Sequence, residues 1–145
     1  MKDSSQSVNW ENPSAEEIRD ILTSSRTIAV VGLSPKPERP SYGVANYLMG
    51  MGYSVIPVNP REIEIMGCKS YPDLTAIGKK VDIVDVFRRG EATPPIVEEA
   101  IKTGAGCIWF QEGVISEESY KLAKDAGVTI VMDRCILKEH QLMGI

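Results

Sequence analysis

Thr27-Ile28-Ala29-Val30-Val31-Gly32-Leu33-Ser34-Pro35 is the stretch that decides the fold of this 145-residue chain. Its first five residues form an apolar, mostly β-branched run typical of a buried strand, and the run ends at Gly32. A polar, proline-rich loop follows, and an amphipathic helix is expected from about Ser41 to Gly50. A strand that passes through such a loop into a helix indicates a nucleotide-binding crossover, with phosphate groups at the helix N-terminus.

Strands and helices are expected to alternate along the rest of the chain. Further strands are expected at 54–58, 81–87, 106–110 and 128–132, with a short one at 69–71. Helix starts are expected near Ser14, Pro94 and Ser116, with a last helix within 136–145. This order predicts an α/β fold: a doubly wound, mostly parallel, Rossmann-like sheet of five to six strands in three layers. Residues 1–13 are predicted to be a polar N-terminal lead and residues 14–145 a single domain.

The composition excludes several classes of protein. The chain is 43% hydrophobic and 25% charged, with a net charge of −4, which argues against nucleic acid as its main partner. No apolar stretch approaches the roughly 20 residues of a membrane span, and the N-terminus lacks the apolar core of a signal peptide. The three cysteines, Cys68, Cys107 and Cys135, are widely spaced, which indicates reduced thiols in the cytoplasm and no metal site.

Ligands of doubly wound sheets bind beyond the carboxyl ends of the strands, so the residues after each strand are the candidates for a binding site. Basic side chains are frequent among them: Lys36, Arg39, Arg61, Arg88, Arg89 and Arg134. A basic cluster on an acidic protein favours an anionic ligand, and guanidinium groups match phosphate geometry.

The second strand end argues against NAD as that anion. An NAD-binding domain has an acidic residue there, but this chain has Asn59, and its glycine loop lacks the full G-x-G-x-x-G pattern. Arg61 is able to accept the 2′-phosphate of NADP, so an NADP-dependent oxidoreductase stays an alternative. No buried His–carboxylate pair is recognised, and the single histidine, His140, is interpreted as a surface or packing residue. No catalytic residue is therefore assigned.

Five motifs at the strand ends carry a family resemblance. They are Val31-Gly32-Leu33-Ser34, Pro57-Val58-Asn59-Pro60, Val84-Asp85-Val86-Phe87-Arg88-Arg89, Ile108-Trp109-Phe110-Gln111-Glu112-Gly113 and Asp133-Arg134-Cys135. Over residues 14–140 the sequence resembles the small stand-alone CoA-binding proteins, which are similar to the CoA-binding domain that opens the α subunit of succinyl-CoA synthetase. The resemblance implies a Rossmann-type domain that holds coenzyme A, or an acyl-CoA, across the strand ends.

The resemblance also implies a role for each matching residue. Gly32, Leu33 and Ser34 would hold phosphate, and Lys36, Arg39 and Arg61 would bind the diphosphate or the 3′-phosphate. Asn59 and Pro60 would line the ribose side, and Phe87 and Arg88 would flank the adenine or its ribose. Gln111 and Gly113 would border the pantetheine arm. Cys135, beside Arg134, is a possible partner for a mixed disulfide with the CoA thiol, and the alternative is an inert, half-buried thiol.

The departures from the synthetase limit what the resemblance implies about activity. The synthetase needs a second domain with a phosphorylated histidine and a separate nucleotide-binding subunit, and no part of this sequence matches either. His140 does not correspond to the phosphorylated histidine. The resemblance therefore implies CoA binding rather than ligase activity. A regulatory module for a synthetase-like partner is a further alternative, and a homodimer is compatible with every interpretation.

Overall fold

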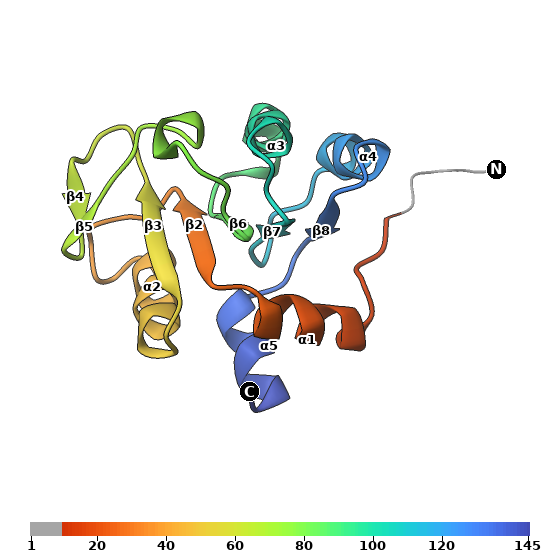
Figure 1. Ribbon diagram of the computed structural model, residues 1–145, viewed down its shortest axis with the longest axis horizontal. Helices are drawn as coiled ribbons and strands as arrows, with labels where there is room; N and C mark the ends of the chain where they lie inside the picture. Colours follow the sequence, from red (N-terminus) through yellow and green to blue (C-terminus); the bar gives the residue numbers. More distant parts are fainter. Residues whose placement is uncertain (1–9) are drawn as a thin grey trace.

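A sheet of five parallel strands forms the centre of the computed structural model, which describes residues 10–145 (Figure 1). The strands are β2 (Thr27–Val31), β3 (Ser54–Val58), β6 (Ile83–Val86), β7 (Cys107–Phe110) and β8 (Thr129–Val131). Their order across the sheet is β3-β2-β6-β7-β8. The chain thus moves outward from β2 to β3, then returns past β2 to β6, and the strand order reverses between β2 and β6.

Helices cover both faces of this sheet and give the molecule three layers (Figure 1). One face carries α1 (Ala15–Ser24), α2 (Pro40–Gly50) and α5 (Ile136–Met143), and the other carries α3 (Thr93–Lys102) and α4 (Glu117–Asp125). Short 3₁₀ turns lie at η1 (Thr75–Ile77) and η2 (Gly90–Ala92). The predicted doubly wound, Rossmann-like α/β fold is confirmed.

The strands supply two separate apolar clusters, one on each face of the sheet. In β2, Ile28 and Val30 pack in the cluster shared with α1, α2 and α5, whereas Ala29 and Val31 pack in the cluster shared with α3 and α4. All four side chains are buried. Burial on both faces explains why the strand sequences are continuously apolar rather than alternating.

The main sheet has five strands, because the short strand expected at 69–71 does not join it. Lys69 lies in a separate antiparallel pair, β4 (Glu64–Ile65) with β5 (Cys68–Lys69). Tyr71 makes a single parallel bridge to Val58. Pro72 follows immediately and has no N–H group with which to extend the pairing.

Two predicted helix caps are confirmed, and a third helix begins elsewhere. Ser14 forms a capping box with Glu17, and the Ser116 hydroxyl accepts a hydrogen bond from the N–H of Ser119. The helix expected from Ser41 begins at Pro40 instead, because proline suits the first position of a helix. Ser41 is buried in the first turn, where it contacts the glycine loop.

The last residues of the predicted N-terminal lead pack against the body of the protein. The Asn12 side chain pairs with the backbone of Met132, donating to its carbonyl at 2.9 Å and accepting from its N–H at 2.7 Å. Trp10 packs against the cluster under α3 and α4. Residues 1–9 lie outside the described part of the chain. No helix in residues 10–145 is long and apolar enough to cross a membrane.

Candidate functional site

A pocket of about 390 Å³ lies at the carboxyl ends of β2 and β3, beside the reversal in strand order. It is lined by Val31, Gly32, Val58, Asn59, Pro60, Arg61, Pro72, Asp73, Leu74, Arg88, Ile96 and Glu99. Its volume lies within the range of small-molecule sites, and its place in the sheet is where doubly wound folds bind ligands.

Gly32 forms the floor of this pocket at the end of β2. Its φ of +89° is one that residues with a side chain rarely adopt. A Cβ atom there would lie 3.0 Å from the carbonyl oxygen of Phe87 and 3.2 Å from the Arg88 side chain. Glycine therefore allows the loops after β2 and β6 to approach each other, and leaves backbone open to a ligand.

The loop between Gly32 and α2 is held in a defined shape by serines. The N–H of Ser34 donates to the buried Ser41 hydroxyl at 3.0 Å, and the Ser34 hydroxyl accepts from the N–H of Lys36 at 3.1 Å. Among the described residues, none accepts a hydrogen bond from the Ser34 hydroxyl. That proton is available to an anionic oxygen.

The N-terminus of α2 differs in charge from those of α1 and α4, and it resembles that of α3, which also lacks an acidic first turn and a capping side chain. α1 and α4 each have two glutamates in the first turn, whereas α2 has no acidic residue there and no capping side chain. Backbone N–H groups give a helix start a partial positive charge, which α1 and α4 balance internally. The start of α2 is therefore suited to an external anion.

Asn59 acts as a brace between two of the loops that line the pocket. Its side-chain amide donates to the carbonyl of Leu33 at 2.9 Å, and its side-chain oxygen accepts from the N–H of Arg61 at 2.9 Å. Both polar ends of the side chain are therefore engaged within the protein. The geometry favours a structural role for Asn59, which positions Arg61 and the glycine loop.

The structure separates the six basic residues that the sequence placed together. Arg61 and Arg88 line the pocket and are exposed. Lys36 and Arg39 are exposed on the loop before α2. Arg89 lies 3.6 Å from a Glu91 oxygen, and Arg134, beyond β8 at the far edge of the sheet, lies 3.5 Å from Glu139. The expected basic cluster is therefore smaller. Arg89 pairs with Glu91, and Arg134 pairs with Glu139 at the other edge of the sheet.

Two carboxylates in the pocket wall were not recognised from the sequence. Glu99 accepts hydrogen bonds from the N–H and the hydroxyl of Thr75 at 3.1 and 2.8 Å, and Asp73 accepts from the N–H of Ala76 at 2.8 Å. The bonds to Glu99 hold the segment after Tyr71 against α3, and the Asp73 bond lies within that segment. No sequence signal connects residue 75 with residue 99, so only the fold could show that they share a wall.

The other predicted site residues lie outside this pocket. Leu33 is fully buried, so only its backbone can face a ligand, and Phe87 is half-buried against the apolar cluster. Gln111 is buried, and its side-chain oxygen accepts from the N–H of Ile136 at 3.4 Å. The N–H of Gly113 donates to Asp133 at 2.7 Å.

Cys135 lies at the same end of the sheet, as the residue that precedes α5. Its exposed fraction is 9%, and it packs in the cluster beneath α1, α2 and α5. It does not line the pocket at β2 and β3. A ligand that touches both regions would have to extend along the strand ends from β3 toward β8.

His140 takes a packing role, as predicted from the sequence. It is buried, its Nδ1 lies 2.7 Å from the Tyr47 hydroxyl, and its ring makes edge-on contacts with Tyr47 and Tyr53. Burial lowers the pKa of the imidazole and favours its neutral form. Residues 10–145 contain no group of three His, Cys, Asp or Glu side chains placed to hold a metal ion.

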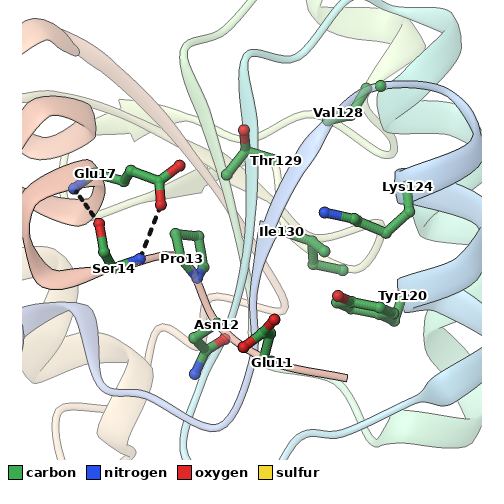
Figure 2. Close-up of a pocket in the computed structure, with 11 residues that line it drawn as sticks. Glu11, Asn12, Pro13, Ser14, Glu17, Tyr120, Lys124, Val128, Thr129 and Ile130 are labelled. Atoms are coloured by element: carbon green, nitrogen blue, oxygen red, sulfur yellow. Dashed lines mark hydrogen bonds between the residues drawn. The ribbon is translucent and has the colours of Figure 1, made fainter. Parts of the chain in front are cut away.

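A larger cavity, of about 530 Å³, lies at the outer edge of β8 (Figure 2). Figure 2 shows Glu11 and Glu17 on one side of it and Lys124 and Tyr120 of α4 on the other. It borders residues 127–130, at the beginning of β8 rather than at the carboxyl end of the sheet. Two carboxylates against one lysine disfavour a phosphate-bearing ligand, so the smaller pocket is the better candidate.

The chain is similar to several proteins along nearly its whole length. The protein YneT of Bacillus subtilis, which is uncharacterised, is 45% identical over 130 residues, covering 90% of this chain and 96% of YneT. A hypothetical protein from Pyrococcus horikoshii has a TM-score of 0.90 and 41% identity, with 97% and 99% of the two chains covered. A Thermus thermophilus structure has a TM-score of 0.86 and 37% identity, with 90% and 99% covered.

A more distant similarity connects the chain to part of a larger enzyme. The ADP-forming acetate–CoA ligase of Methanocaldococcus jannaschii is 23% identical over 119 residues, which are 77% of this chain and 17% of the ligase. The chain therefore spans less than a fifth of that protein. The model of the CoA binding domain matches residues 26–141, from β2 to α5. The chain belongs to the CoA-binding domain family.

Proposed function

We propose that this protein binds coenzyme A, or an acyl-CoA, at the carboxyl ends of the strands, with the nucleotide part in the pocket at β2 and β3. The observation that carries the proposal is that this pocket and the uncapped N-terminus of α2 both follow the carboxyl end of β2. Arg61 and Arg88 supply cationic groups on the pocket wall, and α2 supplies a helix start without acidic residues. Family membership favours CoA as the phosphorylated ligand.

The diphosphate fits the loop between β2 and α2. Gly32 keeps the floor free of side-chain atoms, and the Ser34 hydroxyl has a proton to donate. Lys36 and Arg39 stand at the exposed side of the same loop. Together these groups would hold phosphate oxygens through backbone dipoles and charge-assisted hydrogen bonds.

The adenosine fits the mixed apolar and polar wall of the pocket. Pro60, Leu74 and Ile96 offer apolar surface to a base, and Arg61 and Arg88 flank them. The pantetheine arm would then extend past Phe87 toward Gln111 and Gly113, which lie just beyond the end of β7. On this path the thiol of CoA approaches the region of Cys135.

We assign no catalytic residue, so the proposed activity is binding: storing, sensing or presenting CoA. The cytoplasm suits this role, because all three cysteines are free thiols and CoA is itself a thiol. A homodimer and a synthetase-like partner are both compatible with it.

Calorimetric titration of ligand-stripped protein with CoA tests this proposal, with dephospho-CoA and NADP as comparison ligands. We expect saturable binding of CoA. The Kd of dephospho-CoA should be higher by about tenfold or more, because this ligand lacks the 3′-phosphate. Arg61→Gln and Arg88→Gln should each weaken CoA binding by a similar factor. Arg26→Gln is the matched control, since Arg26 is an exposed arginine at the opposite end of the sheet.

The same titration separates the alternatives. Binding of NADP without binding of CoA would favour an oxidoreductase and overturn the proposal. Equal loss of affinity in the Arg26→Gln control would mean that net charge, rather than the pocket, governs binding. CoA affinity that is unchanged in both pocket variants would place the ligand elsewhere.

A further inference from the structure

Asp85 is an unpaired carboxyl group in the centre of the sheet. It lies on β6, its exposed fraction is 0%, and neither of its side-chain oxygens has a hydrogen-bond partner among the described residues. Such a group is rare in a folded protein, because burial of a polar group without a partner is costly. Stability does not explain its presence, since apolar residues of β-strand type surround it.

Strand register gives the position of Asp85 relative to the candidate site. Asp85 pairs in register with Val30 on β2 and with Trp109 on β7, so these three side chains form one layer on the same face of the sheet. Side chains two residues further along each strand form the next layer on that face. Those residues are Gly32, Phe87 and Gln111, and backbone hydrogen bonds continue the ladder through all three.

Three residues predicted to contact the ligand therefore lie directly above Asp85 and its two neighbours. The separation of the layers along a strand is about 7 Å, the spacing of alternate residues. Trp109 also connects its layer to the turn before α5, because the indole N–H donates to the carbonyl of Arg134 at 2.8 Å. Asp85 thus lies beneath the path on which the phosphates and the pantetheine arm of CoA are proposed to lie.

The surroundings of Asp85 favour its neutral form. Burial raises its pKa well above the usual value for an aspartate. The β2 residues beside it are apolar, and on β7 the nearest titratable group is Cys107, whose pKa burial and Asp85 together raise to about 12. The other titratable groups on this face are Cys135 before α5, His140 on α5, Tyr47 on α2 and Tyr53 after α2, and no lysine or arginine is buried in residues 10–145.

We propose that Asp85 is a proton-linked positioning residue: its carboxyl group is neutral when CoA is bound, and its ionisation opposes the binding of this polyanion in the layer above. This inference rests on the proposed CoA site. An ionised carboxylate in the interior repels phosphate groups more strongly than one in water. Asp85 touches neither phosphate nor thiol, and it acts through the layer of Gly32, Phe87 and Gln111.

The experiment is the pH dependence of CoA affinity in the wild-type protein and in Asp85→Asn, an isosteric variant that cannot ionise. We expect the wild-type Kd to rise with pH, by up to about tenfold for each pH unit above the pKa of Asp85 in the free protein. Asp85→Asn should lack this rise. The titrations of the CoA phosphates and thiol are common to both proteins and cancel in the comparison.

A second measurement keeps the inference testable if the variant does not fold. The ¹³C resonance of the Asp85 carboxyl in the wild-type protein should titrate at a higher pH with CoA bound than without it. An equal titration pH in both states overturns the inference, as does a carboxyl that stays neutral throughout.

The outcomes also separate this inference from the proposed function. Parallel Kd curves for the two proteins would show that Asp85 only packs, and CoA binding itself would stand. Absence of CoA binding by the wild-type protein at every pH would overturn the proposed function and this inference together.

Discussion

Asp82 and Asp85 stand three residues apart, yet they have opposite environments. Asp82 lies just before β6, at the amino end of the sheet, and one of its oxygens accepts from the N–H groups of Arg26 and Thr27 at 2.7 and 3.0 Å. It also accepts from the Thr27 hydroxyl at 3.2 Å. These hydrogen bonds lower the pKa of Asp82, whereas burial without a partner raises the pKa of Asp85.

The contrast extends to the two ends of the sheet. At the amino end, the Asp82 carboxylate joins the beginnings of β2 and β6 and leaves little polar capacity unused. At the carboxyl end lie Asp133, which has a positive φ although it is not glycine, two exposed arginines in a pocket, and the unpaired Asp85. One end is organised for stability, and the other retains strained or unpaired groups of the kind that cluster at functional sites.

The largest effect on stability is expected from Gly32→Ala. A side chain would meet both a positive φ and a backbone carbonyl at 3.0 Å, so we expect a loss of about 2–3 kcal/mol in the free energy of unfolding. Gly113→Ala is the matched control, because its φ is +83° but no atom lies within 4 Å of the added Cβ. Its expected loss is about 1 kcal/mol. Equal losses in urea denaturation would refute the close approach of the two loops.

Asp82→Asn should destabilise the amino end of the sheet. We expect a loss of about 1–2 kcal/mol at neutral pH, because charge-assisted hydrogen bonds become neutral ones. The pKa of Asp82 is lowered in the folded protein, so its contribution is present above the unfolded value of about 3.9 and is lost as pH falls through the folded pKa. Urea denaturation should therefore show the two proteins converging in acid, and a constant difference would contradict this account.

Asp85→Val should have the opposite sign. We expect the free energy of unfolding to rise by about 1 kcal/mol at pH 8, because an apolar side chain replaces an unpaired carboxyl. The folded pKa of Asp85 is raised, so the contribution of Asp85 to stability is greatest below the unfolded pKa of about 3.9 and declines as pH rises through the folded pKa. The advantage of the variant should therefore grow with pH. A variant less stable than wild type at all pH values would point to a hidden partner for the carboxyl.

The smallest effect on stability is expected from Cys135→Ser, whose effect on reactivity should be clear. After treatment with oxidised CoA, mass analysis without reductant should show a CoA adduct on the wild-type protein and none on Cys135→Ser. Cys68→Ser is the control, because Cys68 is half-exposed on β5, away from the proposed thiol path. Cys107 is buried with a raised pKa and should not react. An adduct that survives in Cys135→Ser, or that never forms on the wild type, would exclude this role.

Much of the fold was predictable because its signals are local. The β-branched runs, the Ser14 capping box and the Ser116 cap each depend on residues close together in the chain, and all were confirmed. The start of α2 was placed one residue too late, because Pro40 initiates the helix and Ser41 turns inward to Ser34.

The candidate site was predictable only in part. The position of Gly32 and Arg61 after strands indicated the end of the sheet at which the candidate pocket lies. The pairing of Glu99 with Thr75 depends on a contact between distant segments, and the place of Arg134 at the far edge of the sheet depends on strand order.

The sequence by itself determined that the chain forms a doubly wound α/β domain with basic side chains after several of its strands, because hydrophobic periodicity and turn residues are local properties. Only the tertiary structure decided which arginines share a pocket, that Asn59 braces loops, and that Asp85 is unpaired beneath the site. Strand order and register bring these groups together, and both arise from packing between segments far apart in the chain.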